Sequence, residues 1–258
     1  MFGKFAWVLL LGAGTAASAW SQDAAAPAVM VAKHVGQPIK MDGRMGDPAW
    51  DGATAYPLEL ANGAYDKMLP ALRKSLGSGL REKGWVKLLW TADFLYVGAR
   101  FEDSDIVAEG KEDQTHLYGC GDVVEVFLKP SGETYYWEFY GSPNQLKTCF
   151  FYPGRGRCGL PSCFAGKPTI AVAPSLDGTL NDWCDKDKSW TVELAIPTRT
   201  LTQFGASFDN AAGWTVLVAR YNYSRYLPLK ENSTAPRISG LGMGNHNYEE
   251  YASLRFAE

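Results

Sequence analysis

Apolar and polar residues alternate one by one along much of the chain, which is the period of a β-strand with one buried face. The clearest case is 118–140, where two alternating runs flank the turn-forming residues Pro130, Ser131 and Gly132 and predict an antiparallel hairpin. In the first strand one face is expected to carry Asp122, Val124, Val126 and Leu128, and the other Val123, Glu125 and Phe127; in the second strand Tyr135, Trp137 and Phe139 alternate with Tyr136, Glu138 and Tyr140. Where a solvated face would normally carry Thr, Lys and Ser, the hairpin carries carboxylates among aromatic rings. This combination suits a concave surface that stacks on a ligand and hydrogen-bonds to it. The alternative is that the aromatic rings belong to the core of a sandwich and the acids to its rim.

Further segments with the same alternation predict the rest of a sheet. They are 85–90, 95–101, 169–173, 190–196, 214–223 and 251–256, with a short strand at 39–41 and an edge strand at 56–60. Helical spacing at 66–80, broken by Gly77 and Gly79, predicts a short insertion helix, and 143–168 is expected to be irregular. The pattern is typical of an all-β fold: a two-layer antiparallel β-sandwich, jelly-roll or immunoglobulin-like, with one short insertion helix.

The first residues have the features of an export signal. Lys4 precedes an apolar run at 5–11, and Ala17, Ser18 and Ala19 form a small-residue cleavage site, so 1–19 is interpreted as a signal peptide cleaved after Ala19. The apolar run is too short to span a membrane. Residues 20–28 are expected to be a flexible leader and 29–258 a single β-sandwich domain, secreted or periplasmic.

Charge and cysteine content narrow the functional classes. The net charge of -3 and the absence of a basic run argue against a nucleic-acid partner. The five cysteines are Cys120, Cys149, Cys158, Cys163 and Cys184. In an exported protein such cysteines favour disulfides, and a bridge would tether the loop that Cys149, Cys158 and Cys163 border. The odd number leaves one thiol free or paired between chains, and the connectivity stays open.

Few residues suggest catalysis, and no catalytic residue is assigned. The 154–159 match to G-x-G-x-x-G is flanked by Pro153 and Pro161, which excludes the strand and helix that a nucleotide loop needs. His116 and Cys120 can be read as metal ligands, but a capping or hydrogen-bonding histidine is the commoner case. Three carboxylates, Asp103, Asp105 and Asp122, are candidates for a structural Ca²⁺ site, with a solvated acidic turn as the alternative.

Several runs together resemble a known family. They are 41–50, 89–97 with Asp103, 122–128, 190–197, 213–220 and 246–256. In their order and spacing the chain resembles the family 9 carbohydrate-binding modules, which are related to the DOMON-like sandwiches. The resemblance implies a jelly-roll-like sandwich that binds the ends of glucan or xylan chains, often with structural calcium, and that takes part in carbohydrate breakdown beside a glycoside hydrolase.

The resemblance also implies site residues. Tyr118, just before the Asp-x-Val-Glu strand, corresponds to the first of two rings that clamp the sugar, and Glu125 is the glutamate of that strand. The second ring belongs to the loop where this chain has Asn245 and His246, with Tyr248 nearby. Tyr118 is therefore expected to stack on the sugar, Glu125 and Arg220 to hydrogen-bond its hydroxyls, and Tyr140 and Tyr248 to wall the site. The expected carbohydrate-binding residues are Tyr118, Glu125, Tyr140, Arg220, His246 and Tyr248.

Two alternatives remain open. Glu125 and Glu138 lie on facing strands of one hairpin and can be read as the paired carboxylates of a glycan-processing hydrolase. A haem-binding DOMON-like electron-transfer domain would need axial ligands, for which Met68, His116 or Met243 are candidates. The absence of C-x-x-C-H excludes covalent c-type haem.

Overall fold

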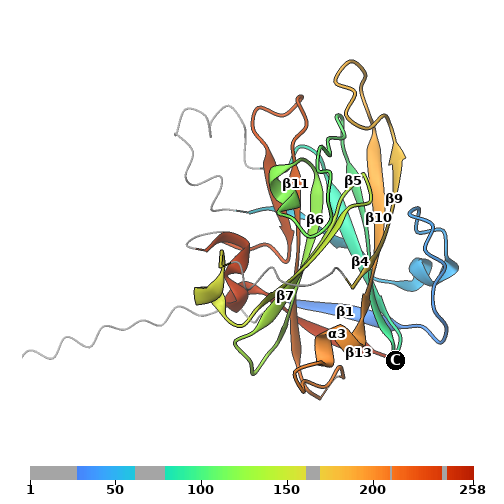
Figure 1. Ribbon diagram of the computed structural model, residues 1–258. Coiled ribbons are helices and arrows are strands. Elements are labelled where there is room, and N and C mark those ends of the chain that lie inside the picture. The colour runs from blue at the N-terminus through green and yellow to red at the C-terminus, as the bar shows by residue number, and fades with distance from the viewer. Residues whose placement is uncertain (1–27, 62–78, 161–168, 210, 240–242) are drawn as a thin grey trace, which may run out of the picture.

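The computed structural model describes residues 28–61, 79–160, 169–209, 211–239 and 243–258. Their regular structure is almost entirely β (Figure 1), which confirms the all-β prediction. The strands are β1 (Val29–His34), β2 (Tyr56–Pro57), β3 (Glu59–Leu60), β4 (Gly84–Trp90), β5 (Phe94–Glu102), β6 (Val123–Pro130), β7 (Tyr136–Gly141), β8 (Lys147–Tyr152), β9 (Ala171–Asp177), β10 (Ser189–Pro197), β11 (Trp214–Asn222), β12 (Glu231–Ala235) and β13 (Ala252–Ala257). The described helical turns are η1 (Pro48–Gly52), η2 (Leu117–Gly119), η3 (Arg155–Arg157), α3 (Thr198–Thr202), η5 (Gly244–His246) and η6 (Tyr248–Glu250).

The strands form one continuous sheet in the order β8-β7-β6-β11-β13-β1-β4-β5-β10-β9, with β2, β3 and β12 paired at its side. Neighbouring strands are antiparallel except at β1, which pairs in parallel with both β13 and β4. The sheet was expected to be purely antiparallel, but it is mixed because of this one strand. β1 lies between the two antiparallel halves of the sheet and joins them through its parallel pairs.

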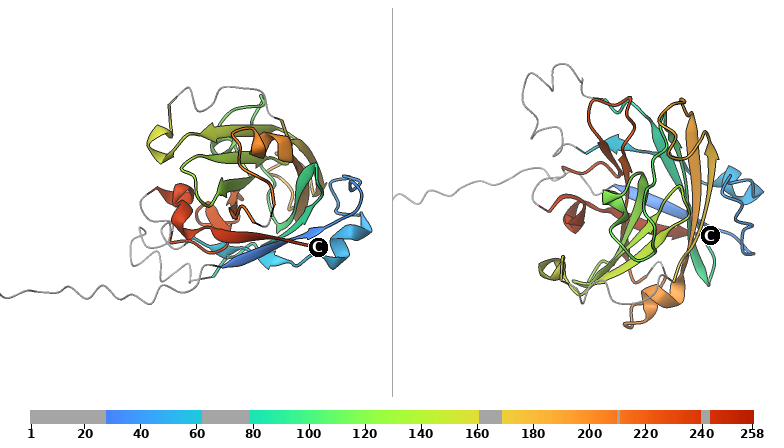
Figure 2. Two further views of the ribbon diagram at one scale, coloured as in Figure 1. Left: turned by 90° about the horizontal axis from the view of Figure 1, so that it is seen from below. Right: turned by 45° about the horizontal axis from the view of Figure 1, so that its top comes forward.

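The sheet curls round a large apolar core (Figure 2), so that its two halves act as the two layers of a sandwich. One half contributes Val124, Val126, Leu128, Trp137 and Phe139 to this core, and the other contributes Leu88, Val97, Phe101, Val192 and Leu194. All ten side chains are fully buried. Val124, Val126 and Leu128, expected to share one face of the first strand, thus lie with Trp137 and Phe139 on the core face of β6 and β7.

The sequence predicted most strands but missed three. The 85–101 and 118–140 hairpins form as expected, as β4–β5 and β6–β7. Residues 39–41, however, are not in a strand, whereas β1, β8 and β12 were not predicted. β8 lies inside the stretch expected to be irregular, and β12, with the sequence Glu-Asn-Ser-Thr-Ala, is polar although Ser233 and Thr234 are buried.

A loop before β2 packs on the outer face of β4, β5 and β10. Asp47 caps η1 by accepting a hydrogen bond from the backbone of Ala49, which places the buried ring of Trp50 against Leu89 and Tyr96. The Trp50 indole donates to Glu193 Oε1 at 2.8 Å. The other oxygen of Glu193 accepts from the backbone N–H groups of Asp42 and Gly43. One buried carboxylate of β10 therefore fixes the whole loop.

Some predictions lie outside the described residues, namely the signal peptide at 1–19, most of the leader, nearly all of the insertion helix at 66–80, and Cys163. No disulfide joins any two of the four described cysteines, and Cys120, Cys149 and Cys184 have free thiols. The expected bridges are thus not formed among these four. Within the described ranges, no helix has the length and hydropathy needed to cross a bilayer.

Candidate ligand-binding site

A cavity of about 360 Å³ opens on the face of the sheet that is turned away from the main core. We call it the Glu125 pocket. Its lining residues come from β6, β7, β8, β11 and β12, from the segments around η2 and η3, and from the loop that contains η5. They are His116, Tyr118, Glu125, Phe127, Glu138, Tyr140, Tyr152, Cys158, Gly159, Tyr221, Asn232, Met243, Gly244, Asn245 and His246. The volume lies in the range of roughly 300–1,000 Å³ that is typical of small-molecule pockets.

Two buried carboxyl groups are the main polar groups of the pocket. The hydroxyls of Tyr140 and Tyr152 donate to the two oxygens of Glu138 at 2.8 and 2.7 Å. The amide of Asn245 donates to Glu125 Oε2 at 3.0 Å. Glu125 Oε1 is buried and makes no hydrogen bond. Since a buried polar atom is normally paired, this oxygen is the polar atom of Glu125 that is available for a hydrogen bond to a bound molecule.

Tyrosine rings line one side of the pocket. Tyr118 is 37% exposed, and its ring centroid lies 5.5 Å from that of Tyr221 and 6.5 Å from that of Tyr140. The hydroxyl of Tyr223 fixes the backbone of Tyr118 by donating to its carbonyl oxygen. Lys230 lies outside these rings, with its ammonium 5.2 Å from the Tyr221 centroid. An accessible tyrosine beside buried carboxyl groups offers a ligand both a flat apolar face and hydrogen-bond acceptors.

The other side of the pocket holds His246, Tyr136 and Cys158. Tyr136 is bonded through its hydroxyl to His246 Nδ1 and to Cys158 Sγ, both at 2.9 Å. Burial lowers the pKa of His246 to about 4, so its ring is neutral at pH 7. This side therefore presents uncharged polar groups.

Burial also shifts the two carboxyl groups. It raises the pKa of Glu138 to about 7, against the opposing hydrogen bonds from Tyr152 and Tyr140. Burial raises the pKa of Glu125 well above its usual range, and the nearby Glu138 raises it further. The causes are loss of solvation and repulsion between like charges.

These shifts predict the pH dependence of stability. We expect the free energy of unfolding to fall as the pH rises from about 6.5 to 8, by about 1 kcal/mol from Glu138 alone. The folded-state pKa of Glu138, about 7, lies above the ordinary value of 4.5. The folded state therefore keeps a proton that the unfolded chain has released, and this advantage is lost as the pH rises through 7. His246 acts in the opposite sense, but mostly at lower pH.

Urea unfolding at several pH values measures this slope, and Glu138→Gln should flatten it. Glu249→Gln is the matched control, because Glu249 is an exposed carboxylate paired with Arg155 outside the pocket. A free energy that stays constant or rises over this range would contradict the prediction.

The structure brings four of the six expected sugar-binding residues to this pocket, namely Tyr118, Glu125, Tyr140 and His246. Tyr248 does not line it. Its ring lies between two cations instead, with the Arg155 guanidinium 4.0 Å and the Lys129 ammonium 5.0 Å from its centroid. His116 and Met243, considered as haem ligands, also line the pocket, while Met68 lies outside the described residues.

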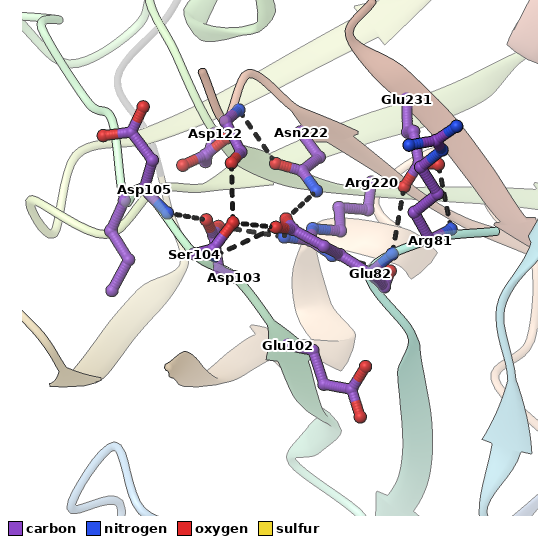
Figure 3. A network of polar contacts seen from close by, with 12 residues as sticks. Arg81, Glu82, Glu102, Asp103, Ser104, Asp105, Asp122, Arg220, Asn222 and Glu231 are labelled. Atoms are coloured by element: carbon purple, nitrogen blue, oxygen red, sulfur yellow. Dashed lines mark hydrogen bonds and ion pairs between the residues drawn. The ribbon is translucent and has the colours of Figure 1, made fainter. Parts of the chain in front are cut away.

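Arg220 lies on the opposite face of β11, inside the sandwich. It is in register with Val124 and shares its face, whereas Glu125 faces the pocket from the other side. Its guanidinium donates to Asp103 Oδ2 at 2.9 Å and to the backbone oxygen of Glu82 at 3.2 Å (Figure 3). The expected contact between Arg220 and a ligand hydroxyl is thus not compatible with this placement.

The three candidate calcium ligands belong to the same interior network as Arg220 (Figure 3). Asp103 accepts hydrogen bonds from Arg220 and from the indole of Trp190. Asp122 accepts from two backbone N–H groups, and Asp105 accepts from a third. No three His, Cys, Asp or Glu side chains within the described ranges are grouped as a metal site. These residues do not fit a calcium site, and calcium binding stays a prediction.

Tyr221 and Tyr152 are pocket residues that the sequence did not identify. The signal for Tyr221 was present, because strict alternation along β11 places Tyr221 with Leu217 and Ala219 on the face of Glu125. Tyr152 ends β8, the strand hidden in a glycine- and proline-rich region. Finding Tyr152 required the strand to be recognised first.

No family model and no curated protein matches the sequence. Solved structures do. A Bacteroides uniformis protein thought to bind carbohydrate has 13% identity and a TM-score of 0.63, over 90% of this chain and 100% of that chain. A family 9 carbohydrate-binding module from Caldicellulosiruptor kristjanssonii, solved with cellotriose, has 13% identity and a TM-score of 0.54, over 89% of this chain and 93% of that chain.

The same type of module from that organism, solved with glucose, has 14% identity and a TM-score of 0.55, over 88% of this chain and 95% of that chain. This chain has the family 9 module fold. At such identities the likeness shows the fold alone, and the fold expected from the resemblance is confirmed. The link to DOMON-like sandwiches stays a prediction.

Proposed function

We propose that this protein binds carbohydrate without transforming it, holding a sugar ring in the Glu125 pocket. The observation that carries the proposal is the unpaired, buried Oε1 of Glu125 beside the accessible ring of Tyr118. A pyranose offers both complements: its C–H face matches the flat tyrosine ring, and its hydroxyls donate to the carboxyl oxygen. The sugar complexes of the two modules with this fold support the same class of ligand.

Tyr118→Ala tests the proposal. We expect it to lower the affinity for the bound saccharide at least tenfold, because the stacking surface is lost while the buried polar groups remain. Isothermal titration against cellobiose and xylobiose, with their reduced alditols, measures the affinity and shows whether the chain end is recognised. Tyr226→Ala is the matched control, since Tyr226 is 41% exposed, close to the 37% of Tyr118, and does not line the pocket. If wild type and Tyr118→Ala bind the saccharide with equal affinity, Tyr118 is not part of the binding site.

A hydrolase that uses Glu125 and Glu138 is the second candidate, because both carboxyl groups line one pocket and both have raised pKa values. The hydrogen bonds from two tyrosines to Glu138 favour a binding role, since they hold both of its oxygens. The test is whether the wild-type protein releases reducing sugar from an oligosaccharide. If this release stops in Glu125→Gln while sugar binding persists, the hydrolase is favoured.

We also propose that the chain is exported and acts beside a glycoside hydrolase. Export is supported by the signal-like pattern at 1–19. The association with a hydrolase is supported by the sequence resemblance to modules that occur beside xylanases. Sequencing of the mature N-terminus after expression in a bacterial host tests the cleavage after Ala19.

A further inference from the structure

The ionisable lining of the Glu125 pocket includes acidic residues but no lysine or arginine among the described residues. These acidic residues are Glu125 and Glu138, and both are buried. Other buried carboxylates of this chain are compensated, as Asp103 is by Arg220 and Glu193 by three N–H donors. Lys230 is exposed, and its ammonium donates to the hydroxyl of Tyr223 at 3.2 Å outside the pocket. The described lining residues therefore include no cation, and Lys230 acts on Glu125 only from outside the pocket.

A polar atom of the pocket that has no hydrogen-bond partner also belongs to a carboxyl group. Glu125 is 2% exposed, and its Oε1 has no donor. Glu138, by contrast, receives two hydroxyl donors. A neutral sugar can supply one hydroxyl to Oε1, but it brings no positive charge that would favour the ionised form of the two carboxyl groups. An ammonium group supplies three donors and a positive charge together.

The tyrosine rings around these carboxyl groups are also suited to a ligand that carries an ammonium group. Tyrosine faces attract cations as well as pyranose C–H groups. This chain already uses its surface tyrosines in that way, since Lys230 lies over Tyr221 and Tyr223, and Arg155 lies over Tyr248. The Glu125 pocket thus combines tyrosine walls with two buried carboxyl groups that have no lysine or arginine among the described lining residues.

We propose that the preferred ligand of the Glu125 pocket is an amino sugar, a saccharide whose protonated amine is held by Glu125 and Glu138 while its ring lies against Tyr118. This inference rests on the proposed function and names the ligand class of the same site. In this proposal Glu125 discriminates between charged and neutral sugars, because its Oε1 is a carboxyl oxygen without a hydrogen-bond partner.

Three disaccharides with the same β-1,4 linkage test it by isothermal titration: cellobiose, fully deacetylated chitobiose and diacetylchitobiose. They carry a hydroxyl, an ammonium and a neutral acetamide at the same carbon. We expect the deacetylated sugar to bind at least tenfold more tightly than the other two. Glu125→Gln should abolish this preference and retain cellobiose binding. Glu249→Gln, which alters an exposed carboxylate outside the pocket, should leave the preference unchanged.

Each outcome has a distinct meaning. Equal affinity for the three sugars overturns the inference and leaves the proposed function standing. Binding of cyclohexylamine as tightly as the deacetylated sugar overturns both, since it shows an ammonium site without sugar recognition. No binding of any sugar also overturns both. If Glu125→Gln fails to fold, as judged by its melting transition, the comparison of the three sugars with the unaltered protein still decides.

Discussion

Replacing Arg220 by methionine is expected to lower the free energy of unfolding by about 3–5 kcal/mol. Arg220 is 1% exposed, and its guanidinium lies 2.9 Å from Asp103, which is equally buried. Burial raises the pKa of Asp103 to about 6, so this group is largely ionised at pH 7 and depends on Arg220 for its counter-charge. Methionine fills much of the same volume but leaves that charge unpaired. Urea unfolding at pH 7 measures the loss.

Two further variants show whether charge is the cause. Lys188→Met removes an exposed ion pair with Asp177 and should change the free energy by less than about 1 kcal/mol. Combining Arg220→Met with Asp103→Asn removes both charges and should recover part of the loss. If the single Arg220 variant unfolds at the wild-type urea concentration, the buried pair does not hold the two layers together.

Glu193→Ala is expected to cost about 2–3 kcal/mol and to loosen the loop that holds Trp50. The substitution removes the acceptor of the buried Trp50 indole and of the Asp42 and Gly43 amides. An unpaired buried donor loses its bonds to water without a replacement, which is the source of the cost. Hydrogen exchange should show faster exchange of the Asp42 and Gly43 amides, and urea unfolding gives the free energy.

Glu193→Gln separates the acceptor from the charge. It keeps one carbonyl oxygen in the same place and should lose roughly half as much stability as the alanine variant. Glu59→Ala serves as a control, because Glu59 is an exposed carboxylate on β3. Unchanged amide exchange at Asp42 and Gly43 in Glu193→Ala would show that the loop is held by other contacts.

Strict alternation predicted the fold well, and departures from it explain the errors. The 118–140 hairpin was predicted correctly because Val, Phe and Trp alternate there with little interruption. β12 was missed because its buried residues Ser233 and Thr234 are hydroxyl side chains, which a pattern of apolar positions does not detect. The parallel pairing of β1 depends on strands distant in sequence, and no local signal encodes it.

The structure brings three of the expected site residues together in one pocket, and their role in binding stays a prediction. Tyr118, Glu125 and Tyr140 line this pocket. Arg220 was expected at the site, but the structure places it with Trp214 and Val218 on the core face of β11. Asn245, which supplies the amide to Glu125, lies in a short turn whose position depends on the whole fold. Its role is therefore visible only in three dimensions.

The parallel strand β1 has a consequence for how the chain folds. β1 is the first described strand, yet it pairs with β13, the last, through the register Val29 to Ser253. Contacts between such distant segments form slowly, because a long loop must close before they are gained. While the chain is being synthesised, β1 has to wait for β13 to emerge. Until then, the edges of β1 and β11 that β13 covers stay open to other strands, and the final strand protects the chain from aggregation.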